Sequence, residues 1–317
     1  MRDQFNRDLT YLRVSITDRC NLRCTYCMPE EGVESMPHEE LLSYEELFIV
    51  IEKFVELGVK KLRITGGEPL VRKDVVKFIE KVASLNKLED IAMTTNGILL
   101  KELAIPLKKA GLHRVNISLD TMNPERYRYM TRGGDLRTVI DGINVAKEAG
   151  LKIKINCVVN KGINDDEIGQ FIQLTKEWGV DVRFIELMPI GQNIQYAQDH
   201  FYSNEMILSQ FPELKEVKAE DISSPARYYQ LEGAQGKVGL ISPLSCNFCA
   251  YCNRLRLTPD GKLKPCLHSD IEIDLKTALR TNQDIVPLIL ESYKIKPEKH
   301  LLDEHKMIVR QMSQIGG

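Results

Sequence analysis

The segment Thr10-Tyr-Leu-Arg-Val-Ser-Ile-Thr17 runs directly into the loop Asp18-Arg-Cys-Asn-Leu-Arg-Cys-Thr-Tyr-Cys27. Apolar and polar side chains alternate along residues 10–17, a period of two that predicts a β-strand. The loop after it carries three cysteines at the spacing C-x3-C-x2-C: Cys20, Cys24 and Cys27. We therefore expect a strand whose carboxyl end opens into a cysteine loop.

The same alternation recurs over roughly 180 residues, and the whole chain of 317 residues is long enough for one large domain or two. Further strands are predicted at 60–65, 89–95, 113–119, 152–159 and 180–187, and helices at 43–57, 73–85, 99–110, 136–149 and 165–177. Regular alternation of strands and helices predicts a parallel sheet with right-handed crossovers. Six such units are too few for a closed eight-stranded barrel, so the predicted fold is α/β, a partial (βα)6 TIM-type barrel; a doubly wound open sheet is the alternative.

The two faces of the predicted strands differ in polarity. One face carries Arg13, Ser15, Thr17, Arg63, Thr65, Asn116, Ser118, Lys154 and Asn156. A doubly wound sheet is covered by helices on both sides and would be apolar on both faces, so the polar face favours a barrel with a ligand in its lumen.

Four cations are predicted to project into this lumen: Arg13, Arg63, Lys154 and Arg183. Unpaired buried charge is costly, so these cations need an anion. A polyanionic substrate such as a nucleoside triphosphate would supply it. The alternative is pairing with acids on neighbouring strands, for which Glu186 is the nearest candidate.

Composition narrows the class of protein. The 317 residues are 43% hydrophobic and carry a formal net charge of −2, so no overall field attracts nucleic acid. The first residues lack the apolar core of a signal peptide, and no apolar run is long enough for a membrane span. Seven of the eight cysteines fall in two groups, at 20–27 and 246–266, which favours metal or redox chemistry over disulfides. We expect a cytoplasmic protein.

Three thiolates can hold a four-iron cluster and leave one iron open. A structural zinc site is the alternative, but it requires a fourth ligand; no further cysteine or histidine lies close to this loop, and His38 is the nearest candidate. The turn Thr65-Gly66-Gly67-Glu68-Pro69 follows the second strand, where it would lie on the same rim as the cysteine loop.

The regular pattern stops after Met188. We place the barrel in residues 1–200 and a C-terminal domain in residues 201–317, which begins irregularly and contains a short strand at 238–241. This domain holds the second cysteine group: Cys246, Cys249, Cys252 and Cys266. A hairpin turning at Pro259-Asp260-Gly261 would return Cys266 to the earlier cysteines. These four residues alone fit zinc or a cluster equally well.

Several motifs resemble those of a known family. The first cysteine motif, with Tyr26 before its last cysteine, and Gly66-Gly67-Glu68-Pro69 are similar to the signatures of the radical S-adenosylmethionine (SAM) superfamily. Further matching segments are Thr94-Thr95-Asn96-Gly97, Phe248-Cys249-x2-Cys252-Asn253-Arg254-Leu255-Arg256-Leu257, Cys266 and Gly316-Gly317. Together they resemble the GTP 3′,8-cyclase family of molybdenum cofactor biosynthesis, from about residue 8 to the C-terminus.

The resemblance implies two [4Fe-4S] clusters, held by Cys20, Cys24 and Cys27 and by Cys249, Cys252 and Cys266. Cys246 departs from the family pattern and is not expected to be a ligand. The implied SAM contacts are Tyr26, Gly67, Ser118 and Met188, and the implied GTP contacts are Arg13, Arg63, Thr94, Lys154, Arg183, Arg254, Leu255 and Arg256. The Gly316-Gly317 tail would reach into the active site.

The implied reaction is that of a lyase. A 5′-deoxyadenosyl radical made from SAM removes the 3′ hydrogen of GTP, and the product is (8S)-3′,8-cyclo-7,8-dihydroguanosine 5′-triphosphate, in the first step of molybdopterin synthesis. Implied partners are cyclic pyranopterin monophosphate synthase downstream and an external electron donor, with no nucleic acid and no membrane; a homodimer is one option. The alternatives are another radical SAM maturase with an auxiliary cluster and a non-catalytic protein with two zinc sites.

Overall fold

A computed structural model describes residues 1–191, 194–246, 248–300 and 310–316. The strands within this part are β1 (Tyr11–Ser15), β2 (Lys61–Thr65), β3 (Asp90–Thr95), β4 (Arg114–Ser118), β5 (Lys152–Val159), β6 (Asp181–Glu186), β7 (Lys215–Val217), β8 (Ala226–Gln230), β9 (Val238–Ile241), β10 (Arg254–Leu257), β11 (Lys262–Lys264) and β12 (Ile273–Asp274). Among the described residues they form one sheet, in the order β12-β11-β10-β1-β2-β3-β4-β5-β6-β9-β8-β7. The predicted α/β partial barrel is confirmed, and its strands β1 to β6 pair in parallel in sequence order.

The C-terminal part of the chain extends this sheet at both edges. Strand β10 pairs in parallel with β1, and β9 pairs in parallel with β6. Antiparallel strands then follow on each side, including the predicted hairpin of β10 and β11. The sequence after Met188 did not indicate that β9 pairs with β6 or that β10 pairs with β1, because these pairings depend on contacts between segments far apart in sequence. The division near residue 200 stays a prediction.

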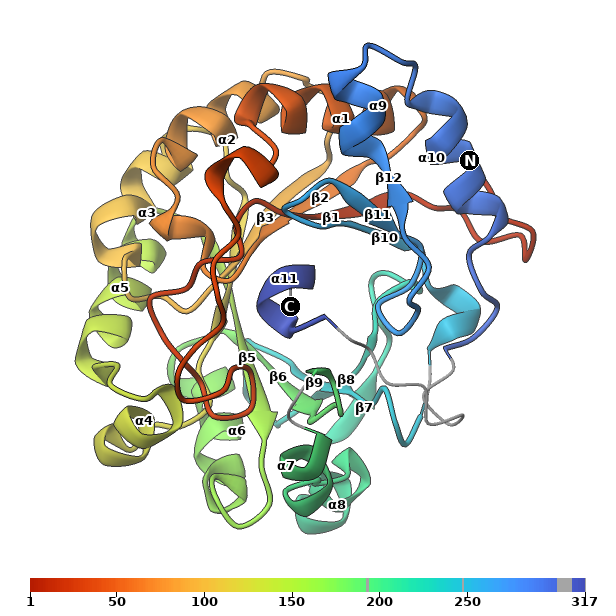
Figure 1. The fold of residues 1–317 in the computed structure, drawn as a ribbon. Helices are drawn as coiled ribbons and strands as arrows, with labels where there is room; N and C mark the ends of the chain where they lie inside the picture. The colour runs from red at the N-terminus through yellow and green to blue at the C-terminus, as the bar shows by residue number, and fades with distance from the viewer. Residues whose placement is uncertain (192–193, 247, 301–309, 317) are drawn as a thin grey trace.

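Helices cover the outside of the curved sheet. They are α1 (Tyr44–Glu56), α2 (Val75–Ala83), α3 (Leu100–Lys109), α4 (Pro124–Thr131), α5 (Leu136–Glu148), α6 (Ile168–Glu177), α7 (Ile194–Asp199), α8 (Asn204–Gln210), α9 (Leu275–Arg280), α10 (Val286–Lys294) and α11 (Met312–Ile315). Helices α1 to α6 form the outer layer, whereas α11, close to the C-terminus, lies in the space that the sheet surrounds (Figure 1). No helix in the described part of the chain has the length and apolar character needed to cross a bilayer.

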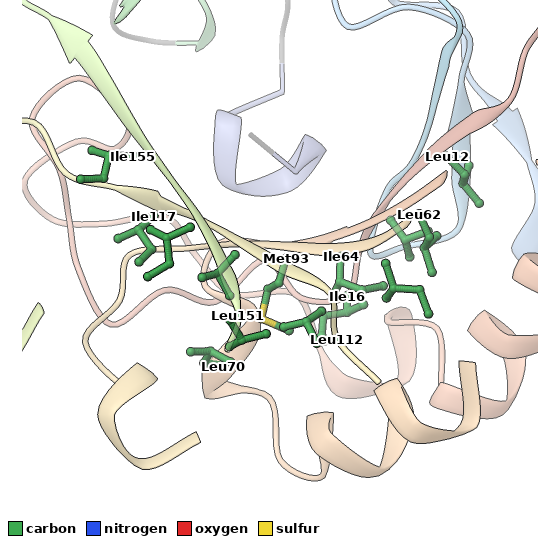
Figure 2. Close-up of a cluster of buried hydrophobic side chains, with 14 of the residues drawn as sticks. Leu12, Ile16, Leu62, Ile64, Leu70, Met93, Leu112, Ile117, Leu151 and Ile155 are labelled. Atoms are coloured by element: carbon green, nitrogen blue, oxygen red, sulfur yellow. The ribbon is translucent and has the colours of Figure 1, made fainter. Parts of the chain in front are cut away.

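The apolar strand faces pack against these outer helices. Figure 2 shows the side chains between sheet and helices, including Leu12, Ile16, Leu62, Ile64, Ile117 and Ile155, all fully or almost fully buried. Burying such side chains stabilises the fold by roughly 1.5–3 kcal/mol each. The alternate residues of the same strands consequently face the lumen, as the polarity of the strands predicts.

Candidate active site

One large cavity of about 1090 Å³ occupies the lumen. Its lining contains the predicted cluster ligands Cys20, Cys24, Cys27, Cys249, Cys252 and Cys266; the predicted SAM contacts Tyr26, Gly67, Ser118 and Met188; and the predicted GTP contacts Arg13, Arg63, Thr94, Lys154, Arg183, Arg254 and Arg256. Residues from both ends of the chain therefore meet in one space.

Two residues that the sequence analysis singled out do not line the cavity, and a third falls outside the described residues. Leu255 does not line the cavity; its side chain is buried in the hydrophobic core, so only its main chain could reach a ligand there. Cys246 is exposed and is also absent from the lining, and its exclusion from the ligands stays a prediction. Gly317 falls outside the described residues.

The first cysteine loop is fastened to the turn after β2. The Gly67 N–H donates to Thr17 O at 2.7 Å, and the Glu68 N–H donates to Arg19 O at 2.8 Å. A Cβ atom on Gly67 would lie 2.5 Å from Arg19 O and 2.6 Å from Asp18 O, so the close approach requires glycine. The two predicted motifs thus form one unit at the carboxyl ends of β1 and β2.

Glu68 ties this unit to β3. Its buried carboxylate accepts hydrogen bonds from Leu70 N, Asn96 N and Thr95 Oγ1. Asn96 in turn donates to Asn21 Oδ1 at 2.7 Å and lies 3.9 Å from Cys20 Sγ. Burial raises the pKa of Glu68 to about 7 against the lowering effect of these hydrogen bonds.

Tyr26 is held from the far side of the loop by Asp120, which follows β4. The Tyr26 hydroxyl donates to Asp120 Oδ2 at 2.8 Å, and Val158 N donates to Oδ1 at 2.8 Å. Burial raises the pKa of Asp120 to about 6. Asp120 was not among the predicted site residues, although its place just after a strand end was a usable signal.

The donor set of the first loop fits a cluster. Burial raises the pKa of the Cys24 thiol well above its ordinary value and that of Cys27 to about 12, so these thiols need the charge of a metal in order to ionise. Soft thiolate ligands are those an iron–sulfur cluster requires.

The second motif has a different electrostatic setting. Burial would raise the pKa of Cys252, but the cations of Arg254 and Lys296 outweigh it and bring the pKa down to about 6. The Cys252 thiol is therefore prepared to act as a thiolate ligand near neutral pH.

Three arginines form a row across neighbouring strands. Arg256 of β10, Arg13 of β1 and Arg63 of β2 are successive register partners, and they face the cavity. Burial, followed by repulsion from Arg256, lowers the pKa of Arg13 to about 9. Burial also lowers the pKa of Arg63 to about 9 and that of Arg256 to about 10.

Several buried polar atoms along this wall have no hydrogen-bond partner among the described residues. They are Arg63 Nε, Arg183 Nε, Arg254 Nη2 and Thr94 Oγ1. Buried donors are normally paired. A row of like charges with unused donors is suited to a ligand with several negative charges.

Lys154 does not depend on a ligand for its counter-charge, contrary to the expectation from the sequence. Its Nζ lies 2.7 Å from Asp181 Oδ2 on the neighbouring strand, so the alternative of internal pairing holds for this cation. Glu186 is not the neutralising acid: its buried carboxylate accepts from Asn204 N and from residues 244–245. Asp181 precedes Arg183 by two positions on the same strand, and that spacing could have placed it on the lumen face.

Tyr228 of β8 is a further residue that sequence reasoning missed. Its hydroxyl accepts from Arg183 Nη2 at 2.9 Å, and the Lys154 ammonium lies 5.7 Å from its ring centre. No local pattern in the irregular segment before β8 indicated this contact.

The C-terminal segment contributes Met312 and Ser313 to the cavity lining. The main-chain oxygen of Gly316 accepts from Arg13 Nη2 at 3.2 Å and from Arg256 Nη1 at 2.9 Å. Ile315 packs with Ile190, and Met188 lies against them. The prediction that the tail reaches the active site is therefore met by Gly316.

Comparisons with known proteins agree with this geometry. The model of the radical SAM superfamily matches residues 14–175, and that of molybdenum cofactor synthesis C matches residues 180–302. A curated GTP 3′,8-cyclase of Peptoclostridium acidaminophilum is 52% identical, over 99% of this chain and 98% of its own length. This chain belongs to the GTP 3′,8-cyclase family of the radical SAM superfamily. A second family member, from Alkaliphilus oremlandii, is 53% identical over the full length of both chains.

Solved structures share the fold. SuiB of Streptococcus suis bound to S-adenosylmethionine has a TM-score of 0.64 at 16% identity; the match covers 89% of this chain and 65% of SuiB. Family membership makes the protein a radical SAM enzyme of molybdenum cofactor biosynthesis and implies one [4Fe-4S] cluster and SAM.

Proposed function

We propose that this enzyme converts GTP to (8S)-3′,8-cyclo-7,8-dihydroguanosine 5′-triphosphate. The observation that carries the proposal is the row Arg256, Arg13 and Arg63, which faces the same cavity as both cysteine motifs. A triphosphate supplies the negative charge that this row needs, and guanidinium groups bind phosphate oxygens in a bidentate manner.

Cys20, Cys24 and Cys27 would hold the first cluster, with SAM contacted by Tyr26, Gly67, Ser118 and Met188. When bound, the cluster and SAM supply the radical that removes the 3′ hydrogen of GTP. The chain's own residues hold the loop in place, through Gly67 and Glu68 on one side and Asp120 on the other.

Cys249, Cys252 and Cys266 would hold a second [4Fe-4S] cluster, which would supply an iron with an open coordination position for the substrate base. Arg254 lies beside Cys252, and the predicted contacts Thr94, Lys154 and Arg183 line the same cavity. Thr94 Oγ1 and Arg254 Nη2 have unused hydrogen-bonding capacity that GTP could satisfy. For Leu255 we propose a main-chain contact only.

Because the tail contacts Arg13 and Arg256 through Gly316, it lies where the substrate is proposed to bind. It helps to keep water away from the reacting atoms once substrate has entered.

The product would pass to cyclic pyranopterin monophosphate synthase, and an external donor would supply the electron. Cysteines without disulfides suit a cytoplasmic enzyme, and a homodimer stays a prediction.

Anaerobically reconstituted protein tests the proposal when it is reduced and incubated with SAM and either GTP or ATP. We expect GTP, but not ATP, to stimulate deoxyadenosine formation and to yield the cyclised nucleotide. If GTP neither stimulates deoxyadenosine formation nor gives that nucleotide, the proposal fails, and a peptide substrate would become the better assumption.

A further inference from the structure

Lys296 is a buried lysine that follows α10 and lines the cavity next to the second cysteine motif. Lys296 is only 1% exposed. The ammonium donates to Pro265 O at 2.7 Å and to Arg254 O at 2.9 Å, and it lies 3.7 Å from Cys252 Sγ. All three donors of the ammonium group are thus used.

These acceptors come from two segments that the hairpin of β10 and β11 separates. Cys252 precedes the hairpin and Arg254 is its first residue, whereas Pro265 follows the hairpin and is bonded directly to Cys266. One ammonium group therefore connects the segment that carries Cys249 and Cys252 with the segment that carries the remaining proposed ligand.

Within the described residues, the ion pairs between side chains do not include Lys296. Burial of a cation without an anion is strongly unfavourable. Arg7 provides the contrast: it also reaches this motif, by donating to Cys249 O at 2.9 Å, but Asp3 neutralises it at 2.6 Å. For Lys296, the anionic group within reach is the Cys252 thiolate and whatever that thiolate binds.

We propose that Lys296 is a positioning residue for the second cluster: it fixes the two ligand segments relative to each other and places a positive charge against the Cys252 sulfur. This assignment rests on the second cluster proposed above. Hydrogen bonds and charges at cluster sulfurs set the reduction potential. A cation stabilises the more negative, reduced state, so Lys296 raises the potential of the second cluster.

The substitution Lys296→Met tests this in the full-length reconstituted enzyme. The matched control is Lys264→Met, because Lys264 is equally buried but donates to Ser269 O and Glu272 Oε1, with no contact to a cysteine sulfur. Iron is counted, and the midpoint potential of each cluster is measured by a redox titration followed by electron paramagnetic resonance.

We expect K296M to shift the second cluster to a more negative potential and leave the first cluster unchanged, with K264M at the wild-type value. If K296M does not retain the second cluster, K296R should restore it by restoring the charge. An unchanged potential in loaded K296M, an equal shift in K264M, or loss of the cluster in both K296M and K296R would overturn the role of Lys296. A wild-type chain that holds only about four irons would overturn the second cluster itself, and Lys296's role with it.

Discussion

Arg13 and Arg256 are register partners on the parallel strands β1 and β10, and both donate to the main-chain oxygen of Gly316. The first lies near the start of the chain and the second near its end. Their pairing is the point at which the N-terminal barrel and the C-terminal strands form one continuous wall of the cavity.

Replacing Arg256 with alanine should weaken GTP binding about tenfold or more, because a hydrogen bond to a charged group contributes roughly 1.5–3 kcal/mol. Isothermal titration with GTP and with SAM measures the effect. SAM affinity and iron content should stay at wild-type values. Arg227→Ala is the control, since Arg227 is an exposed arginine on β8; equal GTP affinity in R256A and R227A would refute the assignment.

Asp181→Asn should lower the melting temperature, because it leaves the partly buried Lys154 without its anion, at a cost of roughly 1–3 kcal/mol. Lys154 holds the pKa of Asp181 below its ordinary value despite burial. The pair therefore stabilises the wild type above the carboxyl's unfolded pKa, and this contribution is lost as the pH falls.

GTP should raise the melting temperature of D181N more than that of the wild type, because the triphosphate supplies the missing anion to Lys154. Thermal shift assays with and without GTP compare the two proteins. Equal stabilisation of both would mean that Lys154 does not contact GTP.

Cys246→Ser should retain about eight irons per chain, as expected for two four-iron clusters, because Cys246 is exposed and lies outside the cavity lining. Cys252→Ser is the matched variant and should lose about four irons. Iron analysis after anaerobic reconstitution separates the two. Loss of iron in C246S would make Cys246 a ligand.

In the cluster-free protein, Cys252 should react with iodoacetamide far faster than Cys27 at neutral pH. The thiolate is the reactive form, and the pKa is about 6 for Cys252 and about 12 for Cys27. The rate at Cys252 should rise with pH through 6 and level off above 7, whereas Cys27 should stay slow. Peptide mass spectrometry over a pH series measures both; similar pH profiles would contradict the electrostatic difference.

Gly67→Ala should abolish SAM binding, because the added Cβ would clash with the main chain at Asp18 and Arg19 and displace the turn. The three cysteines of the loop are untouched, so iron should still bind in part. Gly169→Ala in α6 is the control, since its Cβ would meet only the Phe211 ring, at 3.3 Å. Wild-type SAM affinity in G67A would remove Gly67 from the SAM site.

Local patterns in the sequence were sufficient for much of this fold. Alternation located strands β1 to β6 and the faces of Arg13 and Arg63, because a strand's period depends only on its own backbone. The residues of each cysteine motif lie close in sequence, so their spacing was also informative. Helix α4 was missed because its sequence, rich in arginine and tyrosine, has no clear apolar stripe.

Contacts between distant segments were beyond the reach of these patterns. Lys154 pairs with Asp181, and the side chain of Leu255 faces the core, since β10 joins the sheet with Arg254 and Arg256 turned to the lumen. Neither fact is visible without the register of the strands.

The sequence by itself determined the repeating strands and helices, the cations of the barrel wall and the spacing of both cysteine groups, because each depends on neighbours within a few residues. Only the tertiary structure decided that β10 lies against β1, that Gly316 meets Arg13 and Arg256, and that Lys296 joins the two segments of the second motif. These contacts unite residues up to about 300 positions apart. The pairing of β10 with β1 forms because unpaired backbone groups at the edge of a sheet favour a partner strand. The contacts of Gly316 and Lys296 are hydrogen bonds from charged side chains to main-chain oxygens, and they exist only where the fold brings these segments together.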